Sequence, residues 1–315
     1  MIKYLTKNTG ELQQVEDTAS AQWICILPDF TGAELIQWAH DLGIPGSYLT
    51  DVLDEEKRPR YEINGNWKYL LLRTPICMPK GDAEDEVYKT VPIGIIFQAE
   101  IVITICAFES PVLQAFLADE VENFDPSDAS LFVLQLLEQN VDYYLECLKD
   151  LDSLRDKLEE ELFDSSRTCE LQRLLGIDKS LLHFVNSLSA NEALQKKIWK
   201  NDLLELRADK IKANQFEEIR MDNAQALQTA NMYSNILNGI METYGTIIST
   251  NLNVTIGRLT VITLVLMVPT LIASFYGMNV SLPFEKNPNA FVILVVFAVL
   301  LSIGLTFYFQ RRRMF

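Results

Sequence analysis

Three neutral residues lie between two long apolar stretches near the C-terminus: Gly277, Met278 and Asn279. None is a strong acid, base or metal ligand, but amide and carbonyl oxygens accept hydrogen bonds from the waters around a cation. A ring of carboxylates would hold a divalent cation too tightly for release, whereas neutral oxygens bind its waters more weakly. We therefore expect a filter for a hydrated cation, with Asn279 turned toward an axis and Met278 packing the loop. Gly277 is expected to allow a helix exit that a Cβ would obstruct. The alternative is a plain helix C-cap, because Gly and Asn favour the left-handed conformation.

The run before this tripeptide carries its polar side chains on one face. On a helix turning about 100° per residue, four hydroxyls lie within about 80° of one another: Thr260, Thr263, Thr270 and Ser274. Asn253 and Met267 fall on or beside the same arc. Such hydroxyls bond to their own helix or join helices, or they line a water-filled path. The second interpretation requires an oligomer, because two spans per chain cannot enclose a pore. Leu259 and Met267 are then candidates for a hydrophobic gate, which closes by dewetting.

Two uncharged runs position these residues, and each exceeds the roughly 20 residues that cross a bilayer as a helix. They predict a first, pore-lining transmembrane helix at 256–276, an outer loop at 277–289, a second transmembrane helix at 290–309 and a basic tail at 310–315. Arg258 precedes the first helix and three arginines follow the second. Because basic residues stay inside, both termini are expected in the cytoplasm of a multi-pass plasma-membrane protein.

Composition narrows the function further. The net charge is −16, although the tail is basic, so the rest of the chain is strongly acidic. We expect no nucleic-acid partner, because phosphate contacts need a positive surface. Five scattered cysteines and two histidines do not have zinc-site spacing. The sequence motifs of hydrolases, nucleotide-binding enzymes and metalloproteases do not occur, so we expect neither an enzyme nor an organic cofactor.

The remaining chain predicts an α+β membrane protein with a cytoplasmic α/β regulatory domain at 1–125. Strands are expected at 23–27, 59–63, 67–73, 91–97 and 101–106, and a helix at 32–43. Asn64-Gly65 is a strong hairpin signal. An acidic helical hairpin is expected at 126–200, followed by a stalk helix at 201–255 that continues into the first span. Pro269 is expected to kink that span.

These features together resemble the CorA-type magnesium channels. That family ends with two spans, a Tyr-Gly-Met-Asn sequence closing the first span, and a short basic tail. Here the sequence runs from Tyr276 to Asn279, and the tail reads "RRRMF". Residues 244–260 resemble the family's approach to the pore, with Tyr244, Asn251 and Asn253 in place. Residues 49–75 resemble the opening of the family's cytoplasmic domain.

The resemblance implies a homopentameric funnel in the membrane lipid that conducts Mg²⁺ inward. The outer loop departs from the family, whose members often carry Met-Pro-Glu-Leu, because here Leu282-Pro283-Phe284 is followed by a single acid, Glu285. A zinc-transporting branch shares the Gly-Met-Asn tripeptide, so transport of Zn²⁺, Co²⁺ or Ni²⁺ is the alternative. From another class, the chain could be a two-span anchor for a sensing or scaffolding domain. The sequence alone gives neither the subunit number nor an open or closed state.

The family also places a regulatory cation sensor between subunits. The acidic segment holding Asp82 and Asp85 lies where the resemblance places one half, and Glu218 or Asp222 on the stalk falls near the other. Like charges brought together repel, and a bound divalent cation relieves that repulsion. Cytoplasmic Mg²⁺ is therefore expected to act as regulator as well as transported ion. The alternative is that these acids only keep the surface soluble.

Overall fold

The computed structural model describes residues 1–8, 11–16, 18–78, 87–99, 101–164, 168–278 and 289–311. The chain forms two compact units, Met1–Gly239 and Ile240–Phe315, which we call the N-terminal and C-terminal units. Helix α6 (Lys210–Tyr276) contributes its first part to the N-terminal unit and the rest to the C-terminal unit.

A seven-stranded mixed sheet forms the centre of the N-terminal unit, in the order β2-β1-β3-β7-β6-β5-β4. The strands are β1 (Ile2–Asn8), β2 (Glu11–Val15), β3 (Trp23–Ile26), β4 (Arg60–Asn64), β5 (Trp67–Cys77), β6 (Tyr88–Gln98) and β7 (Ile101–Cys106). Neighbours pair antiparallel except β3 and β7, which pair parallel. The five expected strands are present. The sequence reading missed β1 and β2, whose mixed polar residues lack a clear alternation.

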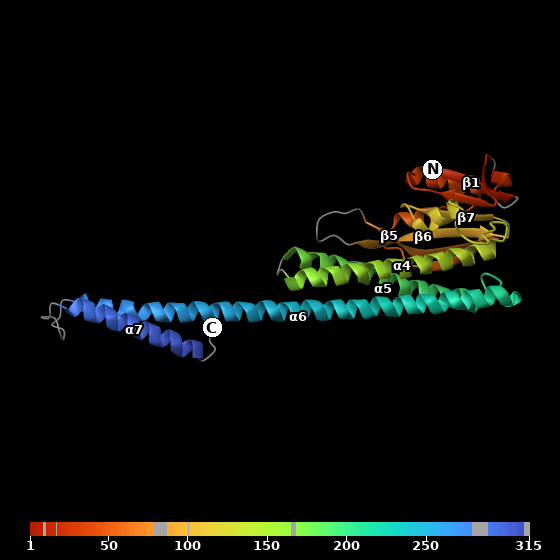
Figure 1. Cartoon of the computed structure of the whole chain (residues 1–315). Helices are drawn as coiled ribbons and strands as arrows, with labels where there is room; N and C mark the ends of the chain where they lie inside the picture. Colours follow the sequence, from red (N-terminus) through yellow and green to blue (C-terminus); the bar gives the residue numbers. More distant parts are fainter. Residues whose placement is uncertain are drawn as a thin grey trace. The chain divides into compact units, whose positions relative to one another are not determined.

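Alternating side chains divide the hydrophobic core between the two faces of the sheet. Tyr69 and Leu71 of β5 pack toward α1 (Gly32–Leu42) and α2 (Gly46–Thr50). Leu70 and Leu72 pack toward α3 (Pro111–Leu117), α4 (Ala129–Asp164) and the start of α6. Helix α5 (Thr168–Asn201) lies beside α4 on this second face (Figure 1). Short 3₁₀ turns occupy Thr18–Ser20, Asp51–Leu53 and Leu206–Ala208.

The hairpin expected at Asn64-Gly65 joins β4 to β5, but its two loop residues lie one position later in the chain. Asn64 pairs with Trp67, so Gly65 and Asn66 are the two loop residues. Gly65 has a φ of +59°, which glycine adopts without steric strain.

Strand β5 extends past the end of its partner β4. Their pairing runs from Asn64 with Trp67 to Arg60 with Leu71, so the N–H and carbonyl of Arg73, which face the same edge two residues further on, lie beyond the last paired residue of β4. The Arg73 carbonyl accepts instead from Asn191 Nδ2 at 2.9 Å, Asn140 Nδ2 at 3.1 Å and the Tyr144 hydroxyl at 3.2 Å. The Arg73 N–H donates to Asn191 Oδ1 at 3.0 Å. Buried side chains of α4 and α5 therefore complete the hydrogen bonding of the sheet.

The helices that follow differ from expectation mainly at their starts. Helix α4 begins at Ala129, where Asp128 Oδ1 accepts the Leu131 N–H. Helix α6 begins at Lys210 rather than near 201, because a turn intervenes in which Asp202 and Glu205 have positive φ angles. Asp209 then caps α6 by accepting the Ile211 N–H at 2.9 Å.

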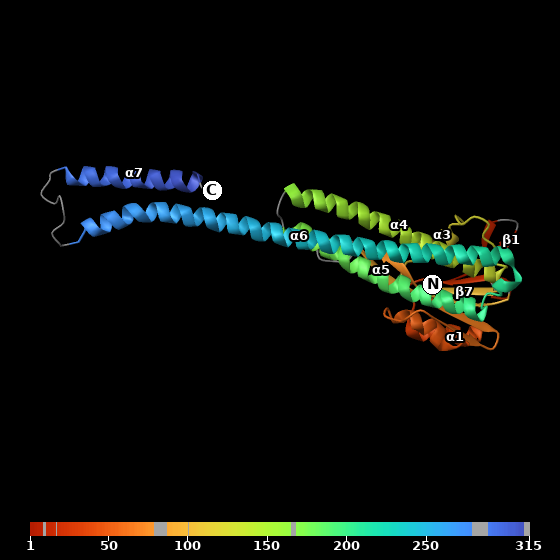
Figure 2. The same ribbon diagram turned by 90° about the horizontal axis from the view of Figure 1, so that it is seen from below.

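The C-terminal unit consists of the rest of α6 and helix α7 (Ala290–Arg311), which runs back along it (Figure 1, Figure 2). Both helices are long and apolar enough to cross a membrane. The residues of α7 that are at least partly buried recur three or four apart: Leu294, Ala298, Ser302, Leu305 and Phe309. Ala298 and Ser302 are small residues one turn apart, a spacing that lets two membrane helices approach closely.

Candidate functional site

The polar face expected on the first span is exposed in the single chain. All six predicted pore-lining residues are exposed: Asn253, Thr260, Thr263, Met267, Thr270 and Ser274. The predicted gate residues are also uncovered, with Leu259 64% and Met267 56% exposed. Helix α6 therefore carries one continuous face that its own chain leaves open.

Helix α7 covers a different face of α6. Val261 is only 2% exposed, and four further residues on its side are partly buried: Val265, Val268, Ile272 and Tyr276. On a helix, these residues centre about 180° away from the hydroxyl arc. The open polar face and the covered apolar face are therefore opposite sides of one helix.

The threonine hydroxyls on the open face bond to their own helix. Thr260, Thr263 and Thr270 donate to the carbonyls of Ile256, Leu259 and Leu266, each at 2.8 or 2.9 Å. The first sequence interpretation, bonding back within the helix, is therefore what the single chain adopts. Because each hydroxyl donates its one hydrogen to a carbonyl of its own helix, it presents only acceptor lone pairs to its surroundings. Acceptors suit the hydrogens of a cation's water shell, so this bonding is also compatible with a water-lined path.

The end of α6 is closed by its own backbone. The Gly277 N–H donates to the carbonyls of Ala273 at 3.0 Å and Ser274 at 3.2 Å, and the Met278 N–H reaches the Phe275 carbonyl at 3.3 Å. A Cβ on Gly277 would meet these two carbonyls at 3.5 and 3.6 Å, which is ordinary contact. The expectation that a Cβ would obstruct the chain here is therefore wrong. Gly277 and Met278 are both exposed, and Asn279 lies outside the described residues.

The glycines with positive φ among the described residues are Gly43 and Gly65, so Gly277 ends α6 without the left-handed conformation of the alternative, a plain C-cap. Its N–H nevertheless satisfies carbonyls of the last helical turn.

The predicted regulatory acids fall in different places. Glu218 on α6 is exposed and Asp222 is partly buried. Asp82 and Asp85 lie outside the described residues. Within the described part of the chain, no group of three or more His, Cys, Asp or Glu side chains is arranged to hold a metal ion. The structure of one chain therefore leaves the sensor as a prediction.

Asp222 acts electrostatically on an acid of the helix α4. Asp142 on α4 is solvent-accessible, but partial burial between helices raises its pKa, and the carboxylates of Glu138 and then Asp222 raise it further. Glu138 of α4 and Asp222 of α6 therefore both lie within electrostatic reach of Asp142. The spacing of Glu138 and Asp142, one helical turn apart, was the signal available in the sequence.

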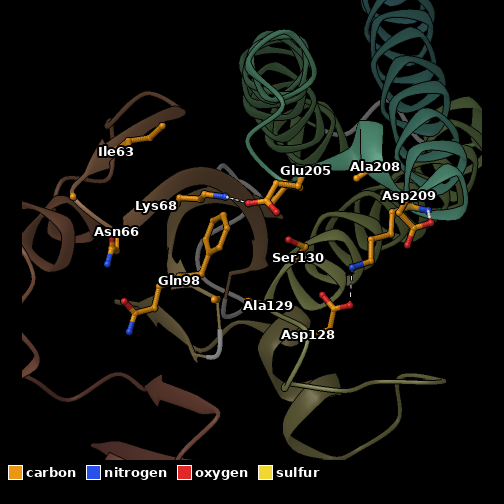
Figure 3. Close-up of a pocket in the computed structure, with 15 residues that line it drawn as sticks. Ile63, Asn66, Lys68, Gln98, Asp128, Ala129, Ser130, Glu205, Ala208 and Asp209 are labelled. Atoms are coloured by element: carbon orange, nitrogen blue, oxygen red, sulfur yellow. Dashed lines mark hydrogen bonds and ion pairs between the residues drawn. The ribbon is translucent and has the colours of Figure 1, made fainter.

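A cavity of about 740 Å³ lies where α6 begins, and both of its lysines are already paired with carboxylates (Figure 3). Lys68 Nζ lies 3.1 Å from Glu205, and Lys212 Nζ lies 2.6 Å from Asp128. These ion pairs join β5 to the turn before α6, and α6 to the start of α4. No predicted site residue lines this cavity. The two ion pairs beside it fix the start of α6.

Known proteins of one family match this chain along nearly its whole length. The sequence profile of the CorA-like Mg²⁺ transporter protein family matches residues 22–312. The cobalt/magnesium transport protein CorA of Methanocaldococcus jannaschii is 24% identical over 283 residues, which cover 88% of this chain and 86% of that protein. CorA of Thermotoga maritima is 22% identical over 333 residues, covering 99% and 88%. The complete structure of the CorA magnesium transporter from M. jannaschii matches with a TM-score of 0.77 and 22% identity, covering 99% of this chain and 98% of that one.

An α/β unit, one long helix and a second apolar helix define a class of two-span membrane protein. The family profile covers most of the chain. The chain therefore belongs to the CorA-like Mg²⁺ transporter family, whose members are transporters and not enzymes. The predicted resemblance and the predicted fold class are both confirmed, while the homopentamer stays a prediction.

Proposed function

We propose that the chain is the subunit of a homopentameric channel that conducts Mg²⁺ inward across the plasma membrane. The N-terminal unit and both termini lie in the cytoplasm, and membrane lipid surrounds the two spans. The open face of α6 lines the path, and Gly277, Met278 and Asn279 form the filter for the hydrated ion. Both curated relatives are named cobalt/magnesium transport proteins, which supports a divalent cation as the transported ion.

The observation that carries this proposal is the opposite placement of the two faces of α6. A two-span anchor would gain nothing from a row of hydroxyls, and α7 of the same chain leaves that row uncovered. Copies of α6 around an axis would bring the uncovered faces together around water. Polar groups in membrane helices usually face such an interior.

Regulation by cytoplasmic Mg²⁺ is part of the same proposal. The inside-negative membrane potential drives cations inward with about 2.3 kcal/mol per charge per 100 mV, so the channel needs a means of closing. Mg²⁺ held between subunits by Asp82, Asp85, Glu218 and Asp222 would favour a closed ring. Its loss would let like charges repel, and Leu259 and Met267 would no longer form a dry constriction.

Transport of Zn²⁺, Co²⁺ or Ni²⁺ remains the second candidate within the family. Cobalt appears in the names of both curated relatives, which favours testing it first. Competition between Mg²⁺ and each of these ions during uptake separates the candidates, because the preferred ion suppresses uptake of the others at the lowest concentration.

The experiment is Mg²⁺ uptake into proteoliposomes that contain the full-length protein. Asn279→Ala removes the amide proposed to accept hydrogen bonds from the ion's waters, so uptake should be lost while the oligomer stays assembled. Thr306→Ala is the matched control, because this hydroxyl lies on α7 and bonds to the Ser302 carbonyl. Normal uptake by Asn279→Ala would refute the filter, and no uptake by the native protein would refute the channel.

A further inference from the structure

Pro269 leaves a gap in the hydrogen bonding of α6. In an α-helix the N–H of residue 269 would donate to the carbonyl of Val265, but proline has no N–H. Val265 is partly buried on the side of α6 that α7 covers. Within a bilayer no water is available to such a carbonyl, so a side chain of a neighbouring helix usually satisfies it.

The Ser302 hydroxyl of α7 is placed to do so. Its Oγ lies 3.4 Å from the Val265 carbonyl oxygen and 3.0 Å from the Ala298 carbonyl oxygen of its own helix. One hydroxyl hydrogen is thus shared between a carbonyl of its own helix and the carbonyl that Pro269 leaves without its donor. Ala298 is 7% exposed, and its small side chain allows the two backbones to approach closely enough for this contact.

We propose that Ser302 is a positioning residue, whose hydroxyl replaces the N–H missing at Pro269 and thereby holds the last turns of α6 against α7. Residues 270–276 follow the proline and lead directly into the tripeptide at 277–279. Thr270 and Ser274 of the open face belong to this segment. The Ser302 hydroxyl contacts the covered side of α6 and thereby fixes the orientation of the open side.

Thr270 supports the same segment from within the helix. Its hydroxyl donates to the Leu266 carbonyl at 2.9 Å, one residue beyond the interrupted bond. Two side-chain hydroxyls therefore act at adjacent carbonyls beside the proline, one from α6 itself and one from α7. Of these two hydroxyls, that of Ser302 is the one that joins α6 to α7, in addition to the apolar packing between them.

A double-mutant cycle with Pro269 tests the inference in the full-length protein in detergent. Ser302→Ala should speed amide hydrogen exchange of residues 270–276 by roughly three- to fifteen-fold, as expected for one interhelical hydrogen bond in a membrane protein. Pro269→Ala restores an N–H to the Val265 carbonyl, so adding Ser302→Ala in that background should leave exchange unchanged. An equal effect of Ser302→Ala in both backgrounds would overturn the proposal.

Two further variants keep the test decisive. Thr306→Ala removes a hydroxyl one turn along α7 that bonds only within its helix at 2.9 Å, and it should not change exchange in α6. Ser302→Thr keeps the hydroxyl and should restore native exchange. If Pro269→Ala fails to assemble, this pair decides, because equal exchange in Ser302→Ala and Ser302→Thr would also overturn the proposal.

The link to ion selection rests on the proposed function. If residues 270–276 position the filter, Ser302→Ala should also change the ratio of Mg²⁺ to Co²⁺ uptake in proteoliposomes, and Ser302→Thr should return it. If the native protein takes up neither ion, the channel proposal fails. The exchange measurements then still decide the role of Ser302, because they do not depend on transport.

Discussion

Replacing Asn191 by leucine should destabilise the N-terminal unit more than any similar change in the same hydrogen-bond network. Asn191 makes two bonds to the backbone of Arg73, one as donor at 2.9 Å and one as acceptor at 3.0 Å. The leucine side chain has a similar volume but no polar atom. The Arg73 carbonyl keeps the Asn140 amide and the Tyr144 hydroxyl, whereas the Arg73 N–H loses the side-chain acceptor recorded for it.

The expected loss of stability follows from this difference between the Arg73 carbonyl and the Arg73 N–H. A buried donor left without a partner costs about 1–3 kcal/mol, and the lost donor bond to the carbonyl adds up to about 1 kcal/mol. We expect a loss of about 2–3 kcal/mol, which lowers the unfolding midpoint of a unit of this size by roughly 4–12 °C. Asn140→Leu is the matched control. Its Oδ1 is already buried without a partner and its Nδ2 gives one of three bonds to the carbonyl, so we expect less than about 1 kcal/mol.

Tryptophan fluorescence during heating measures this unit selectively. All four tryptophans of the chain, Trp23, Trp38, Trp67 and Trp199, lie in the N-terminal unit. The measurement therefore uses the full-length protein in detergent without an added label. Equal midpoints for Asn191→Leu and Asn140→Leu would refute the argument that α5 completes the hydrogen bonding of β5 beyond the end of β4.

Three other predictions concern the path and its control. A cysteine scan of α6, in a background without native cysteines, should show labelling by a membrane-impermeant thiol reagent at Asn253, Thr260, Thr263, Met267, Thr270 and Ser274 but not at Val261, Val265 or Ile272; labelling spread evenly around the helix would contradict the proposed path. Mg²⁺ should slow proteolysis of the native protein but not of the Asp82→Ala/Asp85→Ala/Glu218→Ala variant, and equal protection would remove these residues from the sensor. The pKa of Asp142 is raised above its ordinary 3.8, by burial and then by Glu138 and Asp222, so the folded state binds this proton more tightly than the unfolded state. The stability from Asp142 is then fully present below its ordinary pKa and is lost as pH rises through the folded-state pKa; Asp142→Asn should flatten this dependence and be more stable than the native protein near neutral pH, and an unchanged pH profile of the unfolding midpoint would contradict it.

The sequence predicted those parts of the fold that follow from local pattern. Apolar runs and β-branched residues gave both spans and five strands, and Asn64-Gly65 gave the β4–β5 hairpin. The two missed strands are held by pairing with β3 and with each other, which their own mixed residues do not signal.

The candidate site was predictable to the same degree. Helical periodicity alone placed the six residues of the open face together. The partnership of Ser302 with the Val265 carbonyl depends on how α7 packs against α6, and no spacing in the sequence specifies it. The electrostatic effect of Asp222 on Asp142 likewise arises from packing between elements far apart in the chain.

The back-bonded threonines have a consequence for how the proposed path would respond to its surroundings. From Leu259 to Met278 the chain has no charged or histidine side chain, so no group on this wall changes its protonation near neutral pH. Dissolved salt screens the attraction of an ion to fixed charges, but a wall of hydroxyl and amide dipoles has no fixed charge to screen. Ion conduction past this wall would therefore vary little with pH or ionic strength, and any such sensitivity would have to originate in charged residues outside it, such as the acids of the N-terminal unit or Glu285.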